Sequence, residues 1–170
     1  MPTSRFEPVL HGARPTVPLL AAKVAEGQHF TTPHNVSVGT VTAVTVLVTA
    51  PATGTYHLIG QVQADKAGTW TFSKAPNTSG GTALTTANNN QNSSNTGGLT
   101  ITHTATFVSV GTVLVNGLVG ADSGPMSIAA DDRDGSSEWI LAANQLYLVR
   151  FVAGAAATNV IVTLRHWKET

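Results

Sequence analysis

The densest group of side chains that could do chemistry is the acidic run from Asp131 to Glu138, Asp-Asp-Arg-Asp-Gly-Ser-Ser-Glu. Carboxylates spaced around a glycine can hold a calcium ion. The run lacks the glutamate at the twelfth position and the flanking helices of a complete calcium loop, and Arg133 offsets part of its negative charge. We therefore favour a solvated turn over a cation site here, and we predict no metal and no cofactor for the chain.

Histidines are the other candidate metal ligands or catalytic bases, and the chain has six of them: His11, His29, His34, His57, His103 and His166. Zinc sites draw on ligands at short, regular spacings. Only His29 and His34 lie close in sequence, five residues apart, so the support for a zinc site is weak. His103 shares its alternation with Ile101 and Phe107. That position predicts either a partly buried, hydrogen-bonded histidine or a histidine at a subunit contact.

The segment from Gly120 to Pro125, Gly-Ala-Asp-Ser-Gly-Pro, resembles the Gly-Asp-Ser-Gly-Gly-Pro motif of trypsin-like proteases, with one insertion and one glycine missing. Serine nucleophiles also need a base histidine, an orienting aspartate and an oxyanion hole. No Ala-Ala-His segment precedes any histidine here, and the chain is short for two barrels. We interpret the segment as a β-turn rich in turn-forming residues.

Across the rest of the chain and at Glu138, the acidic residues do not form a pair suited to catalysis. They are scattered, mostly at turns or termini: Glu7, Glu26, Asp65, Asp122, Glu138 and Glu169. Catalytic carboxylates would have to face one cleft, and no glycine-rich phosphate loop precedes a helix. We therefore predict that the chain is not an enzyme.

Composition narrows the function classes further. The 170 residues suit one domain with a substantial core, and the absence of cysteine excludes disulfides and thiolate metal sites. Only 11% of the residues are charged and the formal net charge is zero, whereas typical domains have about 25% charged residues. Scattered Lys and Arg predict no nucleic-acid partner, and the lack of a long apolar run predicts no membrane partner. A surface with few charges favours association.

Period-2 alternation of apolar and polar residues dominates from about residue 31 onward. Five valines share one parity in the first runs: Val36, Val38, Val44, Val46 and Val48. Turn residues separate successive runs, as in Pro51-Ala52-Thr53-Gly54. Such alternation predicts strands that bury one face. We expect an all-β fold over residues 31–170, an antiparallel jelly roll or β-sandwich of about eight strands.

Residues 1–30, here called the N-terminal arm, differ from the rest. Pro8, Pro15 and Pro18 favour an extended path that cannot pair as an interior strand. Residues 18–26 suit a short helix that stops at Gly27. The arm carries six apolar side chains: Phe6, Val9, Leu10, Val17, Leu19 and Leu20. We predict that these side chains dock on a neighbouring molecule; the alternative is a frayed terminus.

Residues 76–98 are rich in Asn, Gly, Ser and Thr and include the run Asn-Asn-Asn-Gln-Asn at 88–92. This composition offers little apolar area to bury. We predict a long exposed loop. Loops of this length are often functional, but a tolerated insertion would have the same composition, and the sequence leaves both open.

Two stretches resemble known families. Residues 50–60, Ala-Pro-Ala-Thr-Gly-Thr-Tyr-His-Leu-Ile-Gly, resemble the Pro-x-x-Gly-x-Tyr motif that begins a strand in trimeric jelly rolls of the tumour necrosis factor and complement type. Residues 138–151 and 160–167 resemble the C-terminal part of small virion proteins of tailed bacteriophages. There a tryptophan strand precedes a Leu-x-x-Asn-x-x-Tyr-Leu-Val-Arg strand, and the last strand ends on an aromatic and an acid, here Trp167 and Glu169.

This resemblance, which covers roughly residues 50–170, implies a homotrimeric jelly roll on the outer surface of a capsid. The chain would be a decoration, or cement, protein whose N-terminal arm binds the major capsid protein. The resemblance carries over no catalytic residues. The alternative is a receptor- or glycan-binding domain of a phage head fibre or tail fibre, which would present an exposed aromatic cluster at one end.

Overall fold

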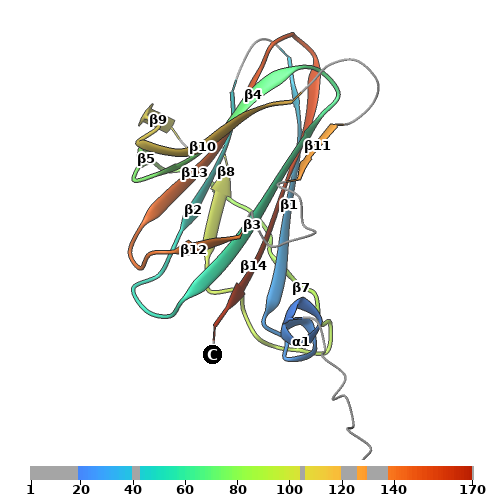
Figure 1. Cartoon of the computed structure of the whole chain (residues 1–170), viewed down its shortest axis with the longest axis vertical. Helices are drawn as coiled ribbons and strands as arrows, with labels where there is room; N and C mark the ends of the chain where they lie inside the picture. Colours follow the sequence, from blue (N-terminus) through green and yellow to red (C-terminus); the bar gives the residue numbers. More distant parts are fainter. Residues whose placement is uncertain (1–18, 40–42, 104–105, 120–125, 130–137, 170) are drawn as a thin grey trace, which may run out of the picture.

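The computed structural model describes residues 19–39, 43–103, 106–119, 126–129 and 138–169. This part of the chain is a two-layer antiparallel β-sandwich with one short helix (Figure 1), which confirms the all-β prediction. Sheet A contains β1 (His29–Val38), β3 (Tyr56–Ala64), β7 (Ala87–Asn88), β11 (Met126–Ala129), β12 (Trp139–Leu141) and β14 (Thr158–Lys168).

Sheet B forms the second layer, and a small third sheet accompanies it. Sheet B contains β2 (Ala43–Thr49), β4 (Gly68–Lys74), β6 (Thr82–Ala83), β8 (Thr100–His103), β10 (Thr112–Val119) and β13 (Leu146–Ala153). The third sheet pairs β5 (Asn77–Ser79) with β9 (Thr106–Ser109).

The first strands of the chain pair with the last strands in reverse order. The first strand β1 pairs with the last strand β14, and β2 pairs with β13. In the same way β3 pairs with β11 and β12, and β4 pairs with β10. Two further ladders, β3 with β14 and β4 with β13, join these pairs into the sheet orders β11-β3-β14-β1-β7 and β10-β4-β13-β2-β8-β6.

The core between the sheets is built from the alternating side chains that the sequence singles out. Val46 and Val48 on β2 and Val160 and Val162 on β14 are at most 1% exposed. Phe151 on β13 is fully buried among them. Period-2 alternation therefore decides which face of each strand points inward.

The outer face of sheet B differs from the expected polar face. Thr45 and Leu47 take the outward positions of β2 but are only 7% and 6% exposed, and Leu148 on β13 is fully buried. Other parts of the chain therefore cover this face. The β5–β9 pair lies beside β10 and β13 in Figure 1, on the connections that leave and re-enter sheet B.

The N-terminal arm is structured where the description begins. The helix expected over 18–26 is present as α1 (Leu19–Ala25), and Gly27, with φ of 67°, follows it in the left-handed region that glycine tolerates. Strand β1 starts at His29, so the sandwich begins two residues before the expected boundary at 31. Within the described part no helix has the length and apolarity needed to cross a lipid bilayer.

Residues 84–98, which we call the asparagine cover, lie in the segment expected to be a long loop. Most of their side chains are exposed, as the composition predicts, but the backbone is tied down: β7 pairs with β1, and the N–H of Leu84 donates to the carbonyl of Ile101. Asparagine side chains then donate to carbonyls at and just beyond the end of α1. Asn90 reaches Ala25 at 3.1 Å, and Asn88 reaches Gly27 at 3.0 Å. These bonds satisfy carbonyls that a helix end leaves open.

Candidate functional site

Three aromatic rings form a row across sheet A near the end of β14. Trp167 lies opposite His29 on β1 and opposite His57 on β3. Its ring stacks on His57 at a centroid distance of 5.1 Å and on His29 at 6.0 Å. Alternation along β14 points Trp167 away from the core, yet it is 2% exposed. The row is therefore a buried patch on the outer side of sheet A.

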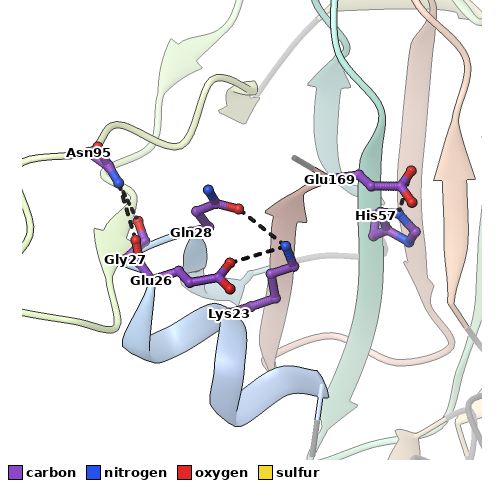
Figure 2. Close-up of polar contacts among 7 residues, drawn as sticks. All are labelled: Lys23, Glu26, Gly27, Gln28, His57, Asn95 and Glu169. Carbon is purple, nitrogen blue, oxygen red and sulfur yellow. Dashed lines mark hydrogen bonds and ion pairs between the residues drawn. The ribbon is translucent and has the colours of Figure 1, made fainter.

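Two carboxylates flank His57 at one end of this row. Its Nδ1 bonds to Glu138, just before β12. Its Nε2 lies 3.7 Å from Glu169 beyond β14, as Figure 2 shows. Both ring nitrogens thus face carboxylates, and the ring face rests on Trp167. A general base needs a nitrogen within hydrogen-bond reach of its substrate. This geometry instead ties β3, β12 and the C-terminal residues together.

His29 closes the other end of the row beside α1 and the asparagine cover. Its Nδ1 lies 2.6 Å from Nδ2 of Asn89, and its backbone carbonyl accepts from the Asn89 N–H. Its Nε2 is buried without a hydrogen-bond partner. Burial, and next the positive charge of Arg165, lower the pKa of His29 below its ordinary value.

His166 lies on the inner face of β14, stacked on Phe30 at 5.4 Å. The residue is fully buried, and burial lowers its pKa to about 4. The nearby Gly97 carbonyl partly offsets that shift, while the charge of His29 adds to it. A methyl group on Gly97 would come within 2.7 Å of the ring nitrogen, so the cover packs directly against this histidine.

The two histidines weighed as zinc ligands do not meet. His29 points to the outer face of β1, whereas His34 points inward and contacts His103 of β8 at a ring distance of 4.4 Å. This contact places His103, half-buried, against a residue of its own chain. In the described part of the chain no group of three or more His, Cys, Asp or Glu side chains could hold a metal ion.

Two segments singled out in the sequence fall outside the described residues. These are residues 120–125, which resemble a protease motif, and residues 131–137 of the acidic run. Glu138, the last acid of that run, is described and bonds to His57. Of the six apolar arm residues, Phe6, Val9, Leu10 and Val17 also fall outside, while Leu19 and the half-buried Leu20 lie in α1.

Helix α1 carries a buried ammonium group. Lys23 is 9% exposed, and its Nζ donates to Glu26 at 3.2 Å and to Gln28 at 3.3 Å (Figure 2). Asn95 of the cover donates to the carbonyls of Glu26 and Gly27. These polar contacts join the helix and the turn after it to the cover, beside sheet A.

A groove of about 450 Å³ opens at this end of the molecule. It is lined by the side or main chains of Gly27, Gln28, Phe30, Asn95, Thr96, Lys168 and Glu169. Its only aromatic residue, Phe30, is 3% exposed, so the groove offers polar groups without an exposed ring. None of the three tryptophans offers a fully exposed ring on which a ligand could stack. Trp167 is buried, and Trp70 and Trp139 are half-buried against the core.

A broad surface with few charges occupies the outer side of sheet A. We call it the sheet A face, defined by the outward side chains of three neighbouring strands: Thr31, Pro33, Asn35, Ser37, Ile59, Gln61, Gln63, Asn159, Ile161, Thr163 and Arg165. Arg165 is the only charged residue in this set. Ile161 at its centre is 39% exposed.

Comparison with known protein families, with curated proteins and with solved structures yields no match for this chain. The arguments about function therefore rest on the sequence and on the geometry described above.

The aromatic row and the histidine contacts were not foreseen from the sequence. The sequence indicated only that Trp167 ends the last strand and that His57 is one of six scattered histidines. The register that sets His57 opposite Trp167 joins residues more than a hundred positions apart. The available signal was their shared outward parity on two predicted strands.

Proposed function

We propose that the chain is a structural virion protein, a jelly-roll homotrimer that decorates and stabilises the capsid of a tailed bacteriophage from its outer surface. Its partner is the major capsid protein, and it needs no cofactor. The observation that carries the proposal is the strand order, taken together with the resemblance of residues 138–167 to small phage virion proteins.

The strand order supports a jelly roll. In that architecture eight strands form two Greek keys in two packed sheets. Here β1 to β4 pair in reverse order with β14, β13, the β11 and β12 pair, and β10. Counting β11 and β12 as one interrupted strand leaves eight principal strands. The shorter strands β5 to β9 then belong to the connection between the fourth and fifth principal strands.

The sheet A face supports association into a trimer. Burying charged groups without partners is costly, and this face carries only Arg165 among its outward side chains. Ile161, together with the 67% exposed Ile140 on β12, offers apolar area on the same sheet. Subunits packed through this face would bury polar amide and hydroxyl groups that can pair across an interface.

The described surface gives less support to a glycan-binding fibre domain. Such a domain needs exposed aromatic rings, and all three tryptophans are buried or half-buried. Catalysis gains no support either, because both nitrogens of His57 face carboxylates and the other four described histidines lie in protein contacts. A non-catalytic structural role fits this set of contacts best.

Attachment through the N-terminal arm is the part of the proposal that a truncation tests. Deleting residues 1–18 removes four of the six apolar arm residues but keeps α1, whose carbonyls the asparagine cover binds. Three arms on one trimer can bind in concert, so weak single contacts suffice. We expect the truncated trimer to fold and to lose most of its binding to undecorated shells of the parent phage.

A matched variant separates apolar docking from mere chain length. Replacing Phe6, Val9 and Leu10 with serine keeps the full arm and should weaken shell binding nearly as much as the deletion. Cosedimentation with shells measures both effects. Unchanged decoration by the truncated, folded trimer would assign attachment to the sandwich instead of the arm.

A further inference from the structure

The asparagine cover is held almost entirely by polar contacts. Leu84 is its only large apolar residue, and the other side chains are Thr, Ala, Asn, Gln, Ser and Gly. A segment with so little buried apolar area depends on each hydrogen bond and close contact, and such segments open locally at low free-energy cost. Any group that changes charge beneath the cover can therefore shift its position.

Two histidines lie beneath the cover, and we call His29 and His166 the histidine seam. His29 contacts Asn89 and His166 lies against Gly97 of the cover. Both seam residues thus join the cover to strands β1 and β14.

Each seam contact suits a neutral imidazole. The buried Nε2 of His29 has no partner, and a charged ring would leave that N–H unbonded beside Arg165. A charged His166 would lie fully buried near His29. Buried unpaired charge and like-charge contact are both strongly unfavourable.

Among the residues that the structure describes, no carboxylate forms an ion pair with His29 or His166. Strands β2, β6 and β7 contain no ionisable residue. Facing groups on β14 and β3 are Arg165, Tyr56 and His57, while α1 and the turn after it carry the mutually paired Lys23 and Glu26. The carboxylate of Glu138 lies by His57, on the far side of the Trp167 ring from His29. Glu169 also lies by His57 and, with Lys168, lines the groove that Asn95 and Thr96 of the cover share.

We propose that the asparagine cover is an acid-released flap: protonation of the histidine seam detaches residues 84–98 from β1 and β14 while the two sheets stay paired. Release would bare the Phe30 and Tyr56 end of the core, which the cover closes at Gly97 and Gly98. The flap is independent of the proposed virion role, since it rests only on contacts within one chain.

The direction follows from proton linkage. An imidazole freed by opening takes up protons near its ordinary pKa of 6.5, whereas His166 in the closed state does so only near pH 4. The contribution of His166 to the stability of the closed state is therefore fully present above pH 6.5 and decreases as the pH falls toward 4. From His166 alone, the opening equilibrium should rise by at most about 30-fold at pH 5 relative to pH 7.5, the limit for a ring that opening exposes fully.

Amide hydrogen exchange on the full chain tests the flap. The N–H groups of Leu84 and Asn89 report the cover, and the N–H of Ala75, bonded to Leu146, reports sheet B. After correction for intrinsic exchange rates, protection at Leu84 and Asn89 should fall at least tenfold between pH 7.5 and pH 5. Protection at Ala75 should change far less over the same range.

Two variants locate the effect. His166→Phe keeps a ring against Phe30 without a titrating group, and it should remove most of the pH dependence at Asn89. His57→Gln alters a described histidine outside the seam and should leave that dependence in place. If His166→Phe fails to fold, the comparison of wild-type protection at pH 7.5 and pH 5 still tests the proposal. Equal protection of the cover at both pH values, or loss at Ala75 in parallel with the cover, would overturn the proposal.

Discussion

At the scale of single residues, Trp167 has the largest expected effect on stability. The ring is 2% exposed and lies between the imidazoles of His29 and His57, so it joins the three central strands of sheet A on their outer side. Trp167→Ala should lower the free energy of unfolding by about 3–5 kcal/mol. Denaturant titration measures this, with Leu118→Ala on β10, where the side chain is 75% exposed, as the control that should cost far less.

The buried imidazole of His166 makes a second prediction, on pH. Its folded-state pKa of about 4 lies below the unfolded value of 6.5, so its contribution to stability is present above pH 6.5 and is lost as the pH falls toward 4. The loss amounts to about 3 kcal/mol. The lowered pKa values of His29 and His34 act in the same direction.

Global unfolding by denaturant at several pH values measures that loss. His166→Phe should flatten the slope of stability against pH between 6.5 and 4. A slope that survives this replacement would mean that other groups dominate acid sensitivity.

At the scale of elements, helix α1 is capped at its C-terminal end by asparagine side chains from a distant segment. A seven-residue helix is too short to be stable alone, and here the amides of Asn88, Asn90 and Asn95 bond the carbonyls at and beyond its end. Asn95→Ala should cost about 1 kcal/mol. Asn95→Asp should cost more, because a carboxylate would face carbonyl oxygens at the negative end of the helix dipole.

Thermal unfolding of these two variants measures the cap. Asn92→Ala is the matched control, since Asn92 bonds to Asn90 through its backbone N–H and the side chain is exposed. Equal melting temperatures for Asn95→Ala and Asn92→Ala would show that the cap contributes nothing.

Local signals in the sequence predicted the elements better than the contacts between distant segments. Local signals predicted well: the valine alternation in β1 and β2 identified inward faces, and Gly27 marked the end of α1. Long-range contacts could not be read in the same way. The bond from Asn90 to Ala25 spans 65 residues, and its existence depends on how β7 meets β1. Composition indicated an exposed loop but carried no information on what its amides bind.

The covered outer face of sheet B shows the same limit. Thr45 on β2 has the polar, outward pattern of an exposed position, and it is 7% exposed because of chain that returns from elsewhere. Alternation tells which side of a strand faces the core, and it does not tell whether a second layer closes the other side.

At the scale of the whole molecule, the sheet A face makes the trimer testable. Ile161→Glu places a charge at the centre of a face whose only charged outward residue is Arg165. If subunits pack through this face, the buried charge should shift sedimentation from trimer to monomer at micromolar concentration. Thr100→Glu, on an exposed position of β8 in the opposite sheet, should leave the trimer intact. A trimer that tolerates Ile161→Glu would move the interface elsewhere.

The virion role itself is tested most directly by electron cryomicroscopy of the parent phage capsid with and without this protein. We predict threefold-symmetric knobs on the outer surface, each accommodating three copies of the two-sheet sandwich, with density from the N-terminal side of α1 reaching the major capsid protein. These knobs should vanish from shells that lack the protein and return when it is added back. Shells that look identical in both cases, or density for this chain only at a fibre or tail, would contradict the account.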